Sequence, residues 1–305
     1  MLLDAASLYF RAFYGVPTSI TTPDGRPINA VRGFLDMTAR LLTTHGPDRL
    51  VACWDDDWRP AFRVDALPSY KAHRVAPEGG EEVPDELSPQ VPVLIEVLAA
   101  AGIERVGAPG YEADDVIGTL ATRARGPVDV VTGDRDLFQL VDDDRGVRVL
   151  YTARGIADIE LVDEAVVSAK YGIPGRAYAD FAVLRGDPSD GLPGVAGVGA
   201  KTAAALINEF GDLARIRAAV GRTVVPKPPL TGAVLKKMYA ASAYLDAAPV
   251  VVAVACDIDL PPVEGMLPRS PADPAALAGL AAAHGLESSL KRLGAALGWP
   301  ADALG

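Results

Sequence analysis

The feature that most constrains the fold of this chain is repeated along it: a short apolar run is closely followed by acidic residues. The runs "MLL", "RLVACW" and "VDVVT" are followed by Asp4, by Asp55, and by Asp134 with Asp136. Short apolar runs bounded in this way predict buried strands. Each predicted strand therefore carries carboxylates at its carboxyl end.

Amphipathic stretches near residues 28–45, 90–101 and 113–125 predict helices between these runs. Strands that alternate with helices predict an α/β fold with a doubly wound, mostly parallel sheet and helices on both faces. Ligands of such open sheets bind beyond the carboxyl ends of the strands. The acids that follow the apolar runs are therefore expected to meet at a binding site.

Two more acidic clusters add to this set. "GYEADDVIG" supplies Glu112, Asp114 and Asp115 before a helical pattern, and "LRGDPSDGLPG" supplies Asp187 and Asp190. Helix capping is the alternative for individual members, since acids favour the first turn of a helix. At about 100° per residue, Glu112 and Asp115 share a helix face while Asp114 points elsewhere. The whole cluster is therefore better evidence for a functional site than any single member.

Carboxylates gathered at one edge of a sheet repel one another unless protons or cations lie among them. No histidine or cysteine accompanies these acids, so the donor set is all oxygen and suits Mg²⁺ or Mn²⁺ rather than Zn²⁺ or copper. Two such ions about 4 Å apart hydrolyse phosphodiesters, one by activating water and the other by stabilising the leaving oxygen. The set therefore predicts a divalent-metal site.

Composition narrows the class of protein. With 305 residues, half of them hydrophobic, the chain is long enough for two domains. Its two cysteines, Cys53 and Cys256, are too few for a disulfide framework or a zinc cluster and fit a reducing cytoplasm. No apolar run approaches membrane-spanning length and the start lacks a signal peptide, so we expect a cytoplasmic protein without a membrane partner.

The net charge of −11 argues against a general nucleic-acid coat, yet basic residues gather in one segment. They are Lys201, Arg215, Arg217, Arg222, Lys227, Lys236 and Lys237. The segment opens with "LPGVAGVGAKTAAALI", which fails the Walker A and dinucleotide patterns because Ala200 separates Gly199 from Lys201 and Thr202 replaces a glycine. We expect a hairpin that grips a nucleic-acid backbone without reading bases, with a solvated helical face as the alternative.

Five motifs in order resemble the bacterial 5′ nucleases, meaning flap endonucleases and the 5′–3′ exonuclease domain of DNA polymerase I. They are "LLDAASLYFRAFY", "CWDDDWRPAFRVDALPSYKAHR", "GYEADDVIGTLA", "VVTGDRDLFQLV" and "RGDPSDGLPGVAGVGAKTAAALI". The resemblance runs from residue 1 to about 260. It implies a PIN-like nuclease domain, a helical arch or clamp, and a helix–three-turn–helix module that holds duplex DNA.

The resemblance assigns metal binding to nine acids, which would hold two or three Mg²⁺ or Mn²⁺ ions. They are Asp4, Asp55, Glu112, Asp114, Asp115, Asp134, Asp136, Asp187 and Asp190. It also implies Lys71 as an electrostatic catalyst at the scissile phosphate, with Arg74 beside it. A solvated surface lysine is the alternative for Lys71. Asp56 and Asp57 are extra acids, and the sequence does not separate their role from that of Asp55.

The resemblance further implies contacts with DNA and K⁺ at carbonyls of the hairpin. The implied DNA contacts are Phe10, Arg11, Arg63, Tyr70, Gly194, Gly197, Gly199, Lys201 and Thr202. Phe10 stands where the family often stacks an aromatic ring on the base beside the cut, and Arg11 where it contacts a phosphate. Core packing is the alternative for Phe10, because it lies in an apolar helix pattern.

The expected domains are a nuclease domain at 1–178 with an arch near 71–92, a helix-hairpin module at 179–265, and C-terminal helices at 266–305. The last helices pack on the core through a stripe of Leu286, Leu290 and Leu293. Residues 75–92 hold four prolines and two adjacent glycines, which argues against one long helix there.

The expected activity is that of a free-standing, monomeric 5′ nuclease of the cytoplasm and nucleoid. Its substrates would be DNA with 5′ flaps, nicks or free 5′ ends, and RNA–DNA hybrids as a further candidate, with 5′-phosphate and 3′-hydroxyl products. Two alternatives stay open. A PIN-type ribonuclease would not need the "GVAGVGAKTAAALI" module, and a DNA-binding scaffold without catalysis would be expected to lack several acids, of which none is missing.

Overall fold

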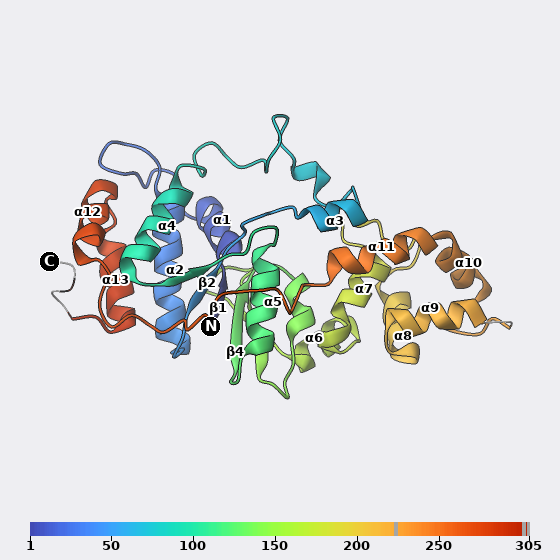
Figure 1. The fold of residues 1–305 in the computed structure, drawn as a ribbon. Coiled ribbons are helices and arrows are strands. Elements are labelled where there is room, and N and C mark those ends of the chain that lie inside the picture. The colour runs from blue at the N-terminus through green and yellow to red at the C-terminus, as the bar shows by residue number, and fades with distance from the viewer. Residues whose placement is uncertain (223–224, 301–302, 304–305) are drawn as a thin grey trace.

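The computed structural model describes residues 1–222, 225–300 and 303, and it centres on a six-stranded sheet (Figure 1). The strands are β1 (Leu2–Asp4), β2 (Val51–Cys53), β3 (Glu104–Val106), β4 (Val128–Thr132), β5 (Val147–Tyr151) and β6 (Glu160–Val162). Their spatial order is β3-β2-β1-β4-β5-β6, and only β5 and β6 pair antiparallel. The expected mostly parallel α/β sheet is confirmed.

The chain order reverses between β1 and β4, which are neighbours in the sheet although far apart in the sequence. Leu2 pairs with Val130 and Leu3 with Val131. Open α/β sheets bind ligands beyond the carboxyl ends of the strands at such a reversal. Asp4 ends β1 and Asp134 follows the end of β4 closely, so the acids of both strands meet at this point.

Helices account for most of the remaining chain. They are α1 (Ala5–Gly15), α2 (Asn29–His45), α3 (Ala61–Ala66), α4 (Gln90–Ala101), α5 (Ala113–Arg123), α6 (Glu164–Tyr171), α7 (Tyr178–Arg185), α8 (Ala200–Phe210), α9 (Leu213–Arg222), α10 (Gly232–Ala240), α11 (Ser242–Val252), α12 (Pro274–His284) and α13 (Glu287–Leu297). Short 3₁₀ helices are η1 (Ala72–Arg74), η2 (Asp136–Leu140), η3 (Gly175–Ala177) and η4 (Pro188–Asp190). Within the described residues no helix is both long and apolar enough to cross a membrane.

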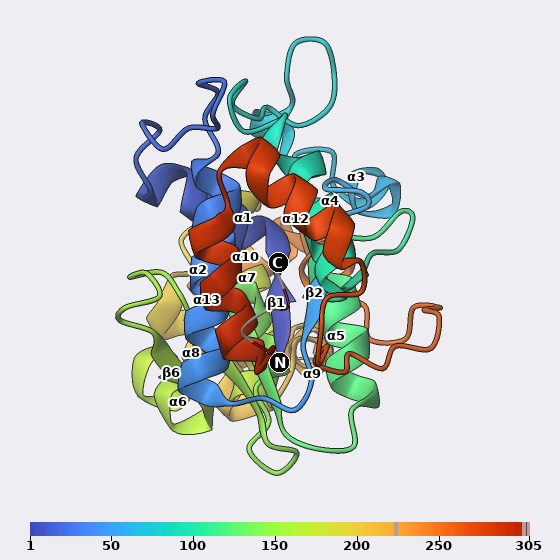
Figure 2. The same cartoon turned by 90° about the vertical axis from the view of Figure 1, so that its left-hand side faces the viewer.

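Both faces of the sheet are covered by helices, as Figure 2 shows with α2 and α5 on opposite sides of β1. Leu2 of β1 packs into the core beneath α5, whereas Leu3 packs into the core beneath α2 and α4. Because successive side chains of a strand point to opposite faces, two buried faces require nearly continuous apolar strands. This explains the short apolar runs of the sequence.

A close helix contact fixes α1 beyond the end of β1. At Gly33 of α2, an added Cβ would lie 2.7 Å from the Cβ of Ala12 on α1, so only glycine admits this approach. Asp4 is the N-cap of α1 and accepts the backbone N–H of Ser7 at 3.0 Å. The packing of α1 on α2 therefore holds an acid at the carboxyl edge of the sheet.

The helices α7 to α11 form the part on the right of Figure 1, and the chain then runs back past α5 to α12 and α13. These last helices pack on α4 and α2, and Figure 2 shows α13 beside α2. The side chains of Leu286, Leu290 and Leu293 are fully buried there. Of the expected C-terminal segment 266–305, residues 301–302 and 304–305 lie outside the described residues.

Residues 75–89, between η1 and α4, contain no α-helix. Both ends of this segment are held by hydrogen bonds. At one end the N–H of Lys71 donates to the carbonyl of Asp190 at 3.0 Å. At the other, the buried carboxamide of Gln90 donates to Asn29 Oδ1 at 3.1 Å. The segment is therefore an irregular loop on fixed ends, in the position expected for the arch.

Candidate metal centre

The turn after β4 presents two of the expected acids. The hydroxyl of Thr132 donates to Asp4 Oδ2 at 2.6 Å and accepts the N–H of Asp134 at 2.9 Å. Asp134 Oδ1 in turn accepts the N–H of Asp136 at 2.9 Å, so a local capping role coexists with presentation of the carboxylate. Thr132 joins the acids of two strands. No role was predicted for Thr132 from the sequence, although its position at the end of a predicted strand was the available signal.

Three further acids reach the same edge from β2 and α5. Asp55 follows β2 and accepts the N–H of Ala113, the first residue of α5, at 2.6 Å. Glu112 is the N-cap of α5, and Asp114 lies in its first turn. The start of α5 is thus tied to the end of β2 by a carboxylate.

Five of the nine acids have no ion pair with a cation in the described part of the chain: Asp4, Asp55, Asp114, Asp134 and Asp136. Burial raises the pKa of Asp55 to about 6. Burial and the charge of Asp55 raise the pKa of Asp4. Burial, followed by the charge of Asp134, raises the pKa of Asp114 and Asp136 well above the ordinary range. These unpaired acids therefore raise one another's free energy when charged.

The other four acids are paired with cations of the protein. The pairs are Glu112 with Arg63 and Lys71, Asp115 with Arg63, Asp187 with Arg135 and Arg185, and Asp190 with Arg74. Burial raises the pKa of Asp190 to about 6, with Lys71 acting in the opposite direction. The protein itself thus balances part of the charge in this half of the cluster.

Arg63 and Tyr70 lie in the interior, which corrects their expected place on the DNA-binding surface. Arg63 is 2% exposed and bonds to Asp115 through both terminal nitrogens, at 2.8 and 2.6 Å. Tyr70 is 4% exposed, and its hydroxyl donates to Glu112 Oε2 at 2.7 Å. Buried carboxylates require such partners, because an uncompensated charge in the interior is costly. The oxygens of Asp115, expected to bind metal, are therefore already engaged.

Lys71 lies at the boundary between the paired and unpaired acids. Among the described residues it is the only non-glycine residue with a left-handed backbone, at φ 47°. Its ammonium donates to Glu112 and its side chain is 15% exposed, unlike a solvated surface lysine. Burial alone would lower the pKa of Lys71, but Glu112, Tyr70 and Asp190 together outweigh it and the pKa is raised. Lys71 is therefore a permanent cation at this edge.

The unpaired acids fit a divalent ion by donor chemistry and charge. All are hard oxygen donors, and Asp136 Oδ1 is buried without a hydrogen-bond partner. Within residues 1–222, 225–300 and 303, no group of three acidic, histidine or cysteine side chains lies close enough together in this arrangement to hold an ion. The fit therefore rests on donor type, uncompensated charge and the unpartnered oxygen.

Asp56 and Asp57 have different partners from Asp55 and do not share its contact with α5. Asp56 lies 3.8 Å from Arg105, and Asp57 accepts the N–H of Arg59 at 3.1 Å. Asp57 therefore stabilises the turn that follows β2, and Asp56 faces Arg105 of β3.

Phe10 and Arg11 lie on α1, the helix that Asp4 caps. Phe10 is partly buried against Tyr9, with ring centroids 5.2 Å apart. An added Cβ at Gly133 would lie 3.3 Å from Arg11 Nη2, which places that guanidinium at the end of β4. The Nε of Arg11 is buried without a partner.

The glycine-rich hairpin leads into α8. Gly199 is the N-cap of α8, and Lys201 and Thr202 follow in its first turn. Gly194 and Gly197 have left-handed backbones, at φ 68° and 71°. The carbonyl of Gly197 accepts the ammonium of Lys237 at 2.7 Å. One hairpin carbonyl therefore already has a cationic partner from this chain.

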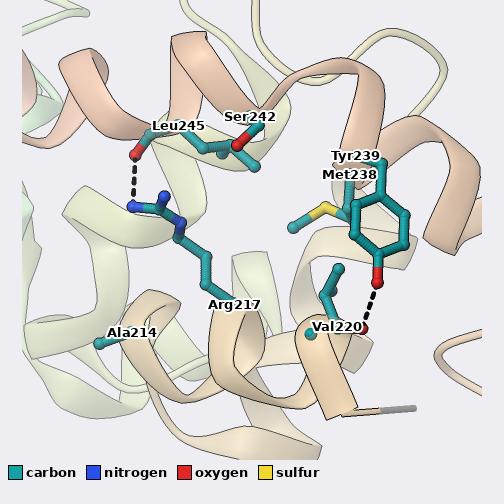
Figure 3. A pocket seen from close by; sticks show the side chains of 8 residues that line it. Ala214, Arg217, Val220, Met238, Tyr239, Ser242 and Leu245 are labelled. Carbon is teal, nitrogen blue, oxygen red and sulfur yellow. Dashed lines mark hydrogen bonds between the residues drawn. The ribbon is translucent and has the colours of Figure 1, made fainter. Parts of the chain in front are cut away.

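A pocket of about 410 Å³ lies among α9, α10 and α11 (Figure 3). It is lined by Ala214, Arg217, Val220, Gly221, Met238, Tyr239, Ser242 and Leu245. Arg217 donates to the carbonyl of Leu245 and Tyr239 to that of Val220. None of the nine acids lines this pocket, so it is distinct from the candidate metal centre.

Two family models match adjoining parts of the chain and together cover residues 1–275. Residues 1–172 match "5′-3′ exonuclease, N-terminal resolvase-like domain" and residues 173–275 match "5′-3′ exonuclease, C-terminal SAM fold". The chain therefore belongs to the 5′-3′ exonuclease family and is a nuclease of the hydrolase class.

Individual relatives agree with this placement. The chain is 61% identical to a 5′-3′ exonuclease of Streptomyces coelicolor, over 96% of this chain and 98% of that protein. It is 55% identical to a 5′-3′ exonuclease of Mycobacterium tuberculosis, over 97% of both. It is 48% identical to DNA polymerase I of M. tuberculosis, over 70% of this chain but 23% of the polymerase.

Solved structures share the fold at low sequence identity. The 5′-exonuclease of bacteriophage T5 with bound zinc ions has a TM-score of 0.62 at 16% identity and covers 97% of both chains. The catalytic core of Rad2 in complex with DNA substrate has a TM-score of 0.60 at 17% identity, over 97% of this chain and 91% of that one. The architecture of sheet plus helical part is therefore common to these nucleases.

Proposed function

We propose that this protein is a divalent-metal-dependent 5′ nuclease, which cuts DNA phosphodiesters where a single strand joins a duplex and removes nucleotides from free 5′ ends. The observation that carries the proposal is the group of five unpaired carboxylates at the reversal of the sheet. A structure of the bacteriophage T5 flap endonuclease, which has the same fold, contains DNA and metal ions. The products would be 5′-phosphate and 3′-hydroxyl ends.

The unpaired acids would hold two or three Mg²⁺ or Mn²⁺ ions, which supply an activated water and stabilise the leaving oxygen. Asp4 and Asp134 approach from neighbouring strands and are linked through Thr132. Asp55 and Asp114 approach from β2 and α5. Glu112, Asp187 and Asp190 keep protein cations beside this group.

Lys71 and Arg74 would stabilise charge on the scissile phosphate. Lys71 is fixed by Glu112, and Arg74 donates to the carbonyl of Ser189 at 2.7 Å. Cations that are held in place before the reaction stabilise developing negative charge without reorganising. Neither residue requires a covalent intermediate with the substrate.

Duplex DNA would be held by the hairpin of Gly194, Gly197 and Gly199 together with Lys201 and Thr202. The free amides at the start of α8 and the basic residues beyond it suit phosphates, so recognition would follow DNA structure rather than sequence. Arg11 would contact a phosphate and Phe10 a base near the cut. K⁺ would bind carbonyls of the hairpin, of which those of Val195, Gly197 and Gly199 already accept hydrogen bonds within the protein. The protein would act as a monomer on 5′ flaps, nicks, free 5′ ends and RNA–DNA hybrids.

The proposal is tested with an end-labelled 5′-flap duplex in Mg²⁺, in Mn²⁺ and in chelator. Wild type is compared with Asp134→Asn, which keeps the oxygen that caps Asp136 and lies at an exposed position, so the fold is retained. Asp144→Asn, at an exposed position before β5, is the matched control. Metal-dependent cutting at the junction by wild type and Asp144→Asn, lost in Asp134→Asn, is the expected result.

Two other outcomes point elsewhere. A flap that is bound but not cut in any metal makes the protein a DNA-binding scaffold. Cutting of single-stranded RNA in preference to the flap makes it a ribonuclease of the PIN type.

A further inference from the structure

The chain segment that returns from α11 towards α12 forms hydrogen bonds with the elements that carry the acids. This return segment, residues 251–258, passes α5 in Figure 1. Its backbone bonds to the side chains of Arg63 on α3, Asp115 on α5 and Gln139 on η2. The bond from Gln139 is of most interest, because η2 begins at the unpaired acid Asp136.

The carboxamide of Gln139 forms three hydrogen bonds with the backbone. Its Nε2 donates to the carbonyl of Asp136 at 2.8 Å and to the carbonyl of Val252 at 3.0 Å. Its Oε1 accepts the N–H of Val254 at 3.1 Å. Both donors and an acceptor of one side chain therefore join the backbone at Asp136 to the return segment. Val252 is also the last residue of α11, so the same contact reaches the helical part.

Local forces around Asp136 act against the position of its carboxylate. Its carboxylate has no ion pair in the described part of the chain, and Oδ1 is buried without a partner. The neighbouring charges of Asp134 and Asp190 push against it. A five-residue 3₁₀ helix has weak internal hydrogen bonds with which to resist this.

We infer that Gln139 is a positioning residue for the metal centre. It holds the backbone of η2 so that the carboxylates of Asp134 and Asp136 stay at the sheet edge, and it joins that edge to the end of α11. The inference rests on the proposed metal-dependent function. Residues that orient metal ligands commonly change metal affinity or activity by about 10–100-fold when mutated.

The test uses Gln139→Met, which keeps the length of the side chain and removes its three hydrogen bonds. The matched control is Thr119→Val on α5. The buried hydroxyl of Thr119 bonds to the same return segment, donating to the carbonyl of Ala255 and accepting the N–H of Ile258, each at 3.3 Å. Both substitutions loosen the return segment, but only Gln139→Met frees η2.

Mn²⁺ binding to the DNA-free protein is measured by electron paramagnetic resonance, beside thermal unfolding and flap cutting. We expect both variants to lower the Tm by a similar amount. Gln139→Met alone raises the Kd for Mn²⁺ and the Mg²⁺ concentration for half-maximal cutting by about tenfold. Equal Mn²⁺ affinity in the two variants would mean that Gln139 is only structural and would overturn the inference.

Gln139→Glu serves if Gln139→Met does not fold. It keeps the acceptor for Val254 and loses both donors, while its added negative charge by itself favours cation binding. Weaker Mn²⁺ binding in Gln139→Glu therefore supports positioning, and unchanged or tighter binding contradicts it. If wild type neither binds Mn²⁺ nor cuts DNA, the proposed function fails and the inference with it.

Discussion

The paired and unpaired carboxylates of the candidate metal centre differ in what balances their charge. Glu112 and Asp115 are bound by Arg63 in the interior, at 2.5 and 2.6 Å, as fixed parts of the fold. Asp114 lies between them in the sequence but has no ion pair with any described residue, and its pKa is raised by burial and by Asp134. Neighbouring acids thus differ in role: Glu112 and Asp115 hold elements of the fold together, whereas the charge of Asp114 is not balanced by any described cation of the protein.

The largest expected effect comes from removing an unpaired acid. Asp114→Asn should slow flap cutting by about a thousandfold or more, since a metal ion supplies several kcal/mol to such a reaction. In chelator the same change should raise the Tm by a few degrees, because it removes a repelled charge. Cutting assays and thermal unfolding check both effects. A variant that is less stable and still active would break the comparison.

Removing the cation of the paired acids should act on stability instead. Arg63→Met leaves Asp115 without a cation in the interior and Glu112 with Lys71 alone, and we expect the free energy of unfolding to fall by about 3–5 kcal/mol. Urea unfolding measures this loss. Adding Asp115→Leu should recover part of it, because the buried charge that has no cation is then gone. A loss below about 1 kcal/mol would show that Arg63 is not the anchor described here.

Lys71 should affect the reaction more than the fold. Lys71→Met is expected to slow cutting by about a hundredfold through lost stabilisation of charge on the phosphate. Mn²⁺ binding should be kept, since Lys71 is bonded to Glu112 rather than to the unpaired acids. Single-turnover cutting and Mn²⁺ titration separate the two effects. Loss of Mn²⁺ binding together with cutting would place Lys71 in the metal site itself.

The smallest expected effect is on pH dependence. The pKa of Asp55 is raised to about 6 by burial, so in a window between about pH 4 and 6 the folded protein holds a proton that the unfolded chain has lost. The stability that protonated Asp55 contributes is therefore fully present below the pKa of Asp55 in the unfolded chain. It is lost as the pH rises through about 6. In chelator the Tm should rise by a few degrees from pH 7 to pH 5. Saturating Mg²⁺ should remove this trend, and a Tm that falls in chelator would contradict it.

The sequence predicted the parts of the fold whose patterns are local. β1, β2 and β4 follow strongly apolar runs, and α2, α4 and α5 follow amphipathic periodicity. β3 and β6 have three residues each and expose part of their surface, so they carry too little pattern to be recognised. The stripe of Leu286, Leu290 and Leu293 was legible because helical spacing alone defines it.

The division of the acids was not predictable, because it depends on long-range packing. Arg63 reaches Asp115 only because α3 lies beside α11 and the start of α5, a contact that no local pattern records. Gln139 likewise gains its role from a return segment more than a hundred residues later in the chain. Residue type and spacing identified where carboxylates gather, but not which of them the protein itself neutralises.

Mn²⁺ binding to variants of two adjacent acids tests whether only the unpaired carboxylates hold the ions. Asp114→Asn and Asp115→Asn differ by one position and change one acid from each group, and both are compared with wild type by electron paramagnetic resonance without DNA. The account predicts that Asp114→Asn loses at least one bound ion, whereas Asp115→Asn keeps the wild-type number and loses stability instead. Loss of an ion in Asp115→Asn, with full binding in Asp114→Asn, would contradict it.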